Sequence, residues 1–114
     1  MERLTVFLGL GSNLDNREAH LRRGVELLAR SLDVIETSSI YATDPWGYSD
    51  QPPFLNMVCH VQTSMAPDDL LLLCQQVEHD AGRKPTFRHG PRVLDVDILA
   101  YGKRIIATSV LEIP

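Results

Sequence analysis

Two aspartates, Asp95 and Asp97, form the pattern in this sequence that is best suited to chemistry. They lie in the run from Gly90 to Leu99, where they alternate with apolar residues as in a β-strand. This alternation places both carboxylates on one face, roughly 6–7 Å apart along the backbone. Because two like charges on one face repel each other, a divalent cation beside them is the natural resolution. A solvated outer strand face is the alternative interpretation.

A basic segment precedes the two aspartates. Between Asp80 and Asp95 the sequence contains no acidic residue. One guanidinium group can bind two phosphate oxygens at once. The segment therefore suits a polyphosphate whose other oxygens are bound by metal. Surface charge that offsets the acidic remainder of the chain is the alternative. The cationic side chains are those of Arg83, Lys84, Arg88 and Arg92, joined by His89.

An aromatic ring and an amide occur together in a second strand pattern, from Phe54 to Thr63. Phe54 and Asn56 share the face opposite the apolar residues of that run. A ring beside an amide suits a flat heterocycle with donors and acceptors on its rim. A core role for Phe54 and a satisfied edge position for Asn56 remain open.

The hydrophobic periodicity predicts the elements that must position these groups. We expect a strand over 4–10, a helix over about 16–32 capped by Asp15 and Glu18, and strands over 33–41 and 54–63. A second helix begins at Pro67 and closes at Gly82, and the aspartate strand leads into a hairpin over 101–106. The turn-rich stretch from Thr43 to Pro53 is long enough to be functional. The order βαββαβ predicts an α+β, ferredoxin-like fold: a four-stranded antiparallel sheet with two helices on one face.

Length and charge set further bounds. The 114 residues correspond to one domain, and a net charge of -4 argues against general binding to nucleic acid or anionic membranes. The apolar runs are too short to span a bilayer, and Met1-Glu2-Arg3 leads into a strand rather than a signal peptide. Cys59 and Cys74 lie in apolar segments without metal-type spacing, so we expect reduced core cysteines in a cytoplasmic protein.

Four motifs resemble one known family in order and spacing. They run from Leu8 to Leu14, from Gln51 to Asn56, from Glu78 to Arg83 and from Arg88 to Leu99. The resemblance is to the 6-hydroxymethyl-7,8-dihydropterin pyrophosphokinases of folate biosynthesis, and it covers essentially the whole chain as one domain, 1–114. It implies the ferredoxin-like fold and transfer of the β,γ-pyrophosphoryl group of ATP to the pterin hydroxymethyl oxygen, with release of AMP.

The resemblance also implies roles for individual residues. Asp95 and Asp97 would bind two magnesium ions that bridge the ATP phosphates. Arg83 and Arg92 would hold the phosphates and stabilise the charge that develops during transfer, with Arg88 in a loop that closes over the site. The pterin would contact Thr43, Pro45, Trp46, Phe54 and Asn56, and the nucleotide would also contact Gln75, Glu78 and Ile98.

The same resemblance implies more protein after the segment from Leu111 to Pro114. Members of the family continue there with a histidine that contacts phosphate, an aromatic that stacks on the pterin, and further helix and strand. A chain of this length should therefore bind more weakly and react more slowly, by about one order of magnitude or more. We expect a monomer acting on small molecules. The alternative from another class is a non-catalytic ferredoxin-like module that binds a ligand or a partner.

Overall fold

A five-stranded antiparallel sheet and two helices form the body of the molecule. The computed structural model of the chain describes residues 2–14, 16–43, 52–82, 92–103, 106–107 and 112–113. The sheet contains β1 (Leu4–Ser12), β2 (Asp33–Thr37), β3 (Tyr41–Thr43), β4 (Phe54–Thr63) and β5 (Asp95–Tyr101). The helices are α1 (Arg17–Ala29) and α2 (Pro67–Asp80), and a separate two-stranded sheet pairs β6 (Ile106–Ala107) with β7 (Glu112–Ile113).

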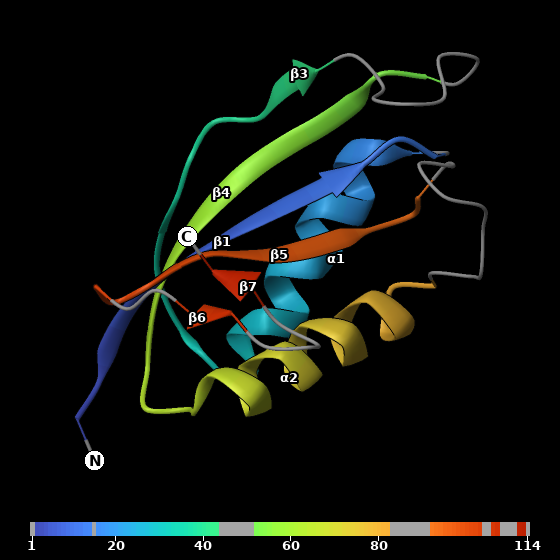
Figure 1. The fold of residues 1–114 in the computed structure, drawn as a ribbon. Coiled ribbons are helices and arrows are strands. Elements are labelled where there is room, and N and C mark those ends of the chain that lie inside the picture. Colours follow the sequence, from blue (N-terminus) through green and yellow to red (C-terminus); the bar gives the residue numbers. More distant parts are fainter. Residues whose placement is uncertain are drawn as a thin grey trace.

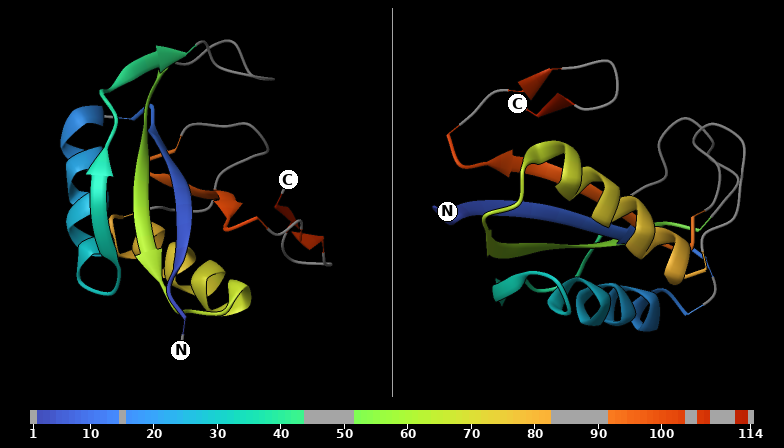
Figure 2. Two further views of the ribbon diagram at one scale, coloured as in Figure 1. Left: turned by 90° about the vertical axis from the view of Figure 1, so that its left-hand side faces the viewer. Right: turned by 90° about the horizontal axis from the view of Figure 1, so that it is seen from below.

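The strand order confirms the predicted ferredoxin-like fold. The order is β2-β4-β1-β5, with β3 also paired to β4, and every pairing is antiparallel. Helix α1 packs against β1 and β4, helix α2 packs against β5, and the two helices contact each other (Figures 1 and 2). Both helices therefore cover one face of the sheet, and we call the other face the open face.

The core lies between the sheet and the helices. The strands contribute alternate residues to it, as the period of two predicted, and the helices contribute one apolar stripe each. Fully or almost fully buried side chains include Val6, Leu8 and Leu10 of β1, Met57, Cys59 and Val61 of β4, and Leu21, Leu28, Leu70, Cys74 and Val77 of the helices. Polar residues at the intervening strand positions are thereby directed to the open face.

A bulge in the pairing of β1 with β5 lets that alternation change phase. Leu8 pairs with Ile98, but Phe7 pairs with Ala100, so Leu99 is the extra residue. Ile98 and Tyr101 can therefore both be buried although they are three positions apart, while Leu99 is 43% exposed. The hydroxyl of Tyr101 donates to the carbonyl of Met65 at 2.5 Å, which ties the end of β5 to the turn before α2.

Two predicted strand features were wrong. The run 33–41 is not one strand, because β2 ends at Thr37 and β3 begins at Tyr41. Between them, the backbone N–H and the hydroxyl of Ser38 bond to the carbonyl and N–H of Val58 instead of continuing the ladder. The predicted hairpin over 101–106 is also wrong, because β6 pairs with β7 rather than with β5; residues 104–105 lie outside the described residues.

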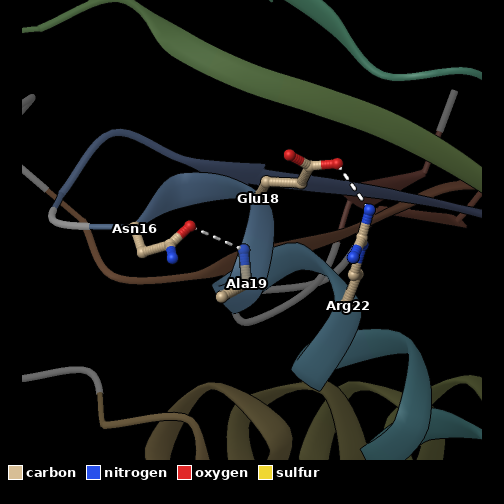
Figure 3. A network of polar contacts seen from close by, with 4 residues as sticks. All are labelled: Asn16, Glu18, Ala19 and Arg22. Carbon is tan, nitrogen blue, oxygen red and sulfur yellow. Dashed lines mark hydrogen bonds and ion pairs between the residues drawn. The ribbon is translucent and has the colours of Figure 1, made fainter.

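The first helix begins differently from the prediction. Its N-cap is Asn16, whose side-chain oxygen accepts a hydrogen bond from the N–H of Ala19 at 3.2 Å (Figure 3). Glu18 does not close a capping box but pairs with Arg22 one turn later at 2.6 Å. Asp15, the predicted cap, lies outside the described residues. The helix ends at Ala29 rather than near 32, although Leu32 is buried.

The cysteine and membrane predictions agree with the structure. Cys59 and Cys74 are buried and free. Among the described residues, no helix is both long and apolar enough to cross a membrane.

The Asn16 cap gives a first testable prediction. Asn16→Ala should lower the free energy of unfolding by about 1 kcal/mol, because the N–H of Ala19 loses its acceptor at the helix start. Urea unfolding followed by circular dichroism measures this. Asn16→Ser keeps an acceptor and should recover most of the loss; equal stability of the alanine variant and wild type would contradict the assignment of the cap.

Candidate active site

The central strand, β1, pairs with both β4 and β5. Its register places predicted site residues of β4 and β5 in one row across the sheet. Gly11 of β1 pairs with Asn56 of β4 on one side and with Asp95 of β5 on the other. Directly opposed residues in a sheet point to the same face, so Asn56 and Asp95 share the open face about 10 Å apart. In the next row Gly9 lies between Val58 and Asp97. These rows lie where β1 ends and β4 and β5 begin (Figure 1).

Two glycines of β1 let side chains of the neighbouring strands lie close over its backbone. A Cβ at Gly11 would lie 3.0 Å from Oδ1 of Asn56 and 3.4 Å from Cδ1 of Phe54. A Cβ at Gly9 would lie 3.2 Å from Cδ1 of Leu99. The amide and the ring therefore approach the backbone of β1 more closely than any larger residue would allow.

The side of the site formed by β3 and β4 carries the groups predicted for a heterocycle. Thr43 pairs with Phe54 across these strands, and Nδ2 of Asn56 donates to Oγ1 of Thr43 at 2.7 Å. This bond fixes the amide plane and leaves its oxygen beside Gly11. Three of the five predicted pterin contacts thus lie together, while Pro45 and Trp46 lie outside the described residues.

The β5 side carries the charged groups. Asp95 and Asp97 occupy alternate positions of the strand, and Asp97 is exposed. Nε of Arg92 lies 3.5 Å from Oδ1 of Asp95, with side-chain exposures of 17% and 30%. Arg92 is thus already placed beside one member of the acidic pair. Arg83 and Arg88, the other predicted phosphate contacts, lie outside the described residues.

Helix α2 contributes Glu78 to the back of the acidic strand. Its Oε2 accepts a hydrogen bond at 2.8 Å from the N–H of Val96, the residue between the two aspartates. Glu78 therefore holds β5 in place. Gln75 is exposed on the same helix, and Ile98 is 8% exposed in the core on the helix side of β5, away from the carboxylates. Neither of these two predicted nucleotide contacts joins the group on the open face.

The charges of Glu78 and Asp97 affect the pKa of a buried thiol in the core. Burial raises the pKa of the Cys74 thiol to about 12, and the charges of Glu78 and Asp97 contribute to that rise. Burial alone raises the pKa of Cys59 to about 11. Neither thiol is a nucleophile near neutral pH, because only the thiolate reacts.

Sequence reasoning missed the parts of the site that have no reactive group. Gly9 and Gly11 stand at alternate positions on one strand face, which is a signal that a backbone is approached closely. Asn13 follows the same strand and is fully buried. The bond from Val96 to Glu78 leaves no signal in the sequence.

The donor set limits which metal the site could hold. Within the described residues no group of three or more His, Cys, Asp or Glu side chains is placed to bind a metal. Two carboxylates, one exposed and one half-buried, do not make a cage for zinc or calcium. They suit magnesium, which keeps water ligands and takes one or two carboxylates together with substrate phosphates.

Comparisons with known proteins indicate one enzyme family. The 7,8-dihydro-6-hydroxymethylpterin-pyrophosphokinase family matches residues 7–114. A protein of Bacillus subtilis named 2-amino-4-hydroxy-6-hydroxymethyldihydropteridine pyrophosphokinase is 46% identical over 111 residues, 96% of this chain and 66% of its own. The protein of that name from Aquifex aeolicus is 41% identical over 110 residues, 96% of this chain and 69% of its own. A mitochondrial folate synthesis bifunctional protein of Arabidopsis thaliana is 42% identical over 96% of this chain and 20% of its own length. The chain spans about two thirds of the two bacterial relatives.

The contact between Glu78 and Val96 gives a second prediction. Glu78→Ala should cost about 1–3 kcal/mol of unfolding free energy, because it leaves the part-buried N–H of Val96 without its acceptor. Glu78→Gln keeps an oxygen acceptor and should cost clearly less. Thermal and urea unfolding of both variants make the comparison, and an equal loss in the two would argue against this hydrogen bond.

The buried thiols give a third prediction, on pH. In the unfolded chain the thiols ionise near their ordinary pKa of 9.0, whereas burial in the folded chain raises the pKa to about 11 for Cys59 and about 12 for Cys74. The folded state then holds more protons above pH 9, so stability falls as the pH rises from about 9 toward 12. Each thiol should contribute a loss of about 1 kcal/mol between about pH 8 and pH 10.

Urea unfolding of wild type and of Cys59→Ala/Cys74→Ala at both pH values isolates this contribution from other titrating groups. The double variant should be less stable at the lower pH and should lose less stability on going to the higher one. Parallel losses in the two proteins would contradict the raised pKa values.

Proposed function

Since this chain belongs to the 7,8-dihydro-6-hydroxymethylpterin-pyrophosphokinase family, the ATP-dependent pyrophosphokinases of folate biosynthesis, we propose that it performs the family's transfer on the open face of its sheet. The hydroxymethyl oxygen of the pterin attacks the β-phosphorus of ATP. The bond from that phosphorus to the oxygen bridging to the α-phosphate breaks, and AMP leaves with that oxygen. The observation that carries the proposal is the row of Asn56, Gly11 and Asp95. This row places an amide that can bind a heterocycle on the same face as the two aspartates.

The pterin is proposed to lie on the open face, beside Asn56 and Phe54 of β4. Asn56 donates to Thr43, so its oxygen is available to accept from the N–H groups on the pterin rim. The ring of Phe54 closes the side of this position. Pro45 and Trp46 are proposed, from the resemblance, to border the same pocket. With its rim bound to Asn56, the pterin would direct its hydroxymethyl group toward β5.

The polyphosphate is proposed to lie over β5. Asp95 and Asp97 would hold two magnesium ions, which fits their alternate positions and their exposure. Magnesium, when bound, would screen the phosphate charge and lower the pKa of the attacking hydroxyl. Arg92, 3.5 Å from Asp95, would exchange part of that contact for phosphate oxygens and stabilise the charge that develops there. Arg83 and Arg88 are proposed to add further phosphate contacts.

This arrangement makes positioning the main source of catalysis. The Asn56 amide orients one reactant and Arg92 holds the other, so the attacking oxygen and the β-phosphorus meet in line. No side chain needs to form a covalent intermediate. Gln75, Glu78 and Ile98, which lie apart from the group on the open face, are proposed from the resemblance to border a part of the nucleotide other than its phosphates. The protein is further proposed to act as a cytoplasmic monomer on small molecules, without nucleic acid as a partner.

The acidic pair supplies the test of this function. Asp97→Asn should lower the rate of AMP formation by about 1,000-fold or more, because the metal contributes several kcal/mol and each 1.4 kcal/mol is about tenfold. It should also remove the magnesium dependence of binding to a non-hydrolysable ATP analogue, measured by calorimetry. The circular dichroism spectrum should not change, because Asp97 is exposed.

Asp33→Asn is the matched control. Asp33 is an exposed strand aspartate that pairs with Arg3, away from the proposed site. It should keep both AMP formation and magnesium-dependent binding. Full activity in Asp97→Asn would overturn the metal assignment. A wild-type chain with no magnesium-dependent heat would favour the non-catalytic module instead.

A further inference from the structure

Asn13 is a fully buried polar residue directly after the central strand. Burying a carboxamide is unfavourable unless its donor and acceptor are both used. Here Nδ2 donates to the carbonyl of Pro52 at 3.2 Å, and Oδ1 accepts from the N–H of Arg92 at 2.7 Å. The backbone N–H of Asn13 also donates to the carbonyl of Arg92 at 3.0 Å. One residue thus bonds two segments that lie 39 and 79 positions away in the chain.

The two bonded segments lead into the two sides of the site. Pro52 stands two residues before Phe54, the first residue of β4, and Arg92 stands three residues before Asp95, the first residue of β5. Asn13 itself lies two residues beyond Gly11, which is paired with both Asn56 and Asp95. The side chain therefore continues the link between β4, β1 and β5 past the point where the strand ladder ends.

The contact to Arg92 holds its backbone from both directions. Its N–H and its carbonyl both bond to Asn13, so the Cα from which the guanidinium extends is fixed. That guanidinium lies 3.5 Å from Asp95. On the other side, the segment at Pro52 has a second tie, because Nη1 of Arg17 donates to the carbonyl of Pro53 at 2.7 Å.

We propose that Asn13 is a positioning residue for both substrates, with its donor arm setting the heterocycle side and its acceptor arm setting the phosphate side. The inference rests on the proposed function, because it assigns the two arms to the two substrates of that reaction. Only asparagine meets the requirement at this length. Aspartate accepts but cannot donate when ionised, and serine is too short to reach both partners.

The two arms can be separated by substitution. Asn13→Asp keeps an acceptor for the N–H of Arg92 but sets a carboxylate against the carbonyl of Pro52. It should raise the KM for the pterin about tenfold and change the KM for ATP by less than about twofold. Asn13→Ala loses both arms and should raise both KM values about tenfold or more. If Asn13→Asp does not fold, Asn13→Ser takes its place and should raise both.

Asn16→Ala is the control for a merely structural effect. It lies three residues away and removes a helix cap without touching either segment. It should lower the melting temperature by a few degrees and leave both KM values unchanged. If wild type forms AMP but the Asn13 variants have the same KM values as Asn16→Ala, the inference is overturned. The proposed function then still stands.

Amide hydrogen exchange tests the tie without any substrate. The N–H of Arg92 should exchange at least about tenfold more slowly in wild type than in Asn13→Ala, with Asn16→Ala like wild type. Equal exchange in wild type and Asn13→Ala overturns the inference. A wild-type chain that forms no AMP overturns the proposed function and with it the assignment of the arms to substrates, while a retained exchange difference still supports Asn13 as the clamp of Arg92.

Discussion

The register of β1 against its two neighbours is the constraint on which the rest of the molecule depends. Gly11 pairs with Asn56 and Asp95 at once, so the heterocycle side and the acidic side are placed by a single strand. A slip of one residue in either pairing would turn the corresponding side chains toward the helices. The buried face of β1 prevents such a slip, because Val6, Leu8 and Leu10 have almost no exposed surface. Core packing thus sets the geometry of the opposite face.

The charges around β5 support the proposed magnesium site. Asp95 and Asp97 lie on one face of β5, and Glu78 bonds to the strand between them from the helix side. Three carboxylates around one short stretch of strand repel each other, and the raised pKa of the Cys74 thiol reflects part of this field inside the core. Arg92 offsets some of it. A polyphosphate alone would add to the repulsion, which is a physical reason for the divalent cations of the proposed reaction.

The sequence predicted those features that follow from periodicity. The bounds of β4, the buried alternation of β4 and β5 and the antiparallel, ferredoxin-like fold were all confirmed. The errors lie where a single hydrogen bond determines the local structure. Ser38 interrupts the predicted strand by bonding to Val58, and Asn16 rather than Asp15 caps α1. Asn13 could not be assigned in advance, because its partners become neighbours only after the sheet has formed. The roles of Pro45, Trp46, Arg83 and Arg88 stay predictions, since they lie outside the described residues.

The division of labour between strands and segment ends has a physical logic. Groups that must be placed to within a fraction of an ångström are best held on rigid elements, and Asn56, Asp95 and Asp97 all belong to strands. Asn13 and Glu78 then extend that rigidity to points the ladder does not reach, by satisfying backbone groups of Pro52, Arg92 and Val96. Because these bonds go to backbone atoms, they do not depend on which side chains the joined segments carry. Substitutions around Pro52 and Arg92 can therefore change the side chains near the site while the rows through Gly9 and Gly11 keep their spacing.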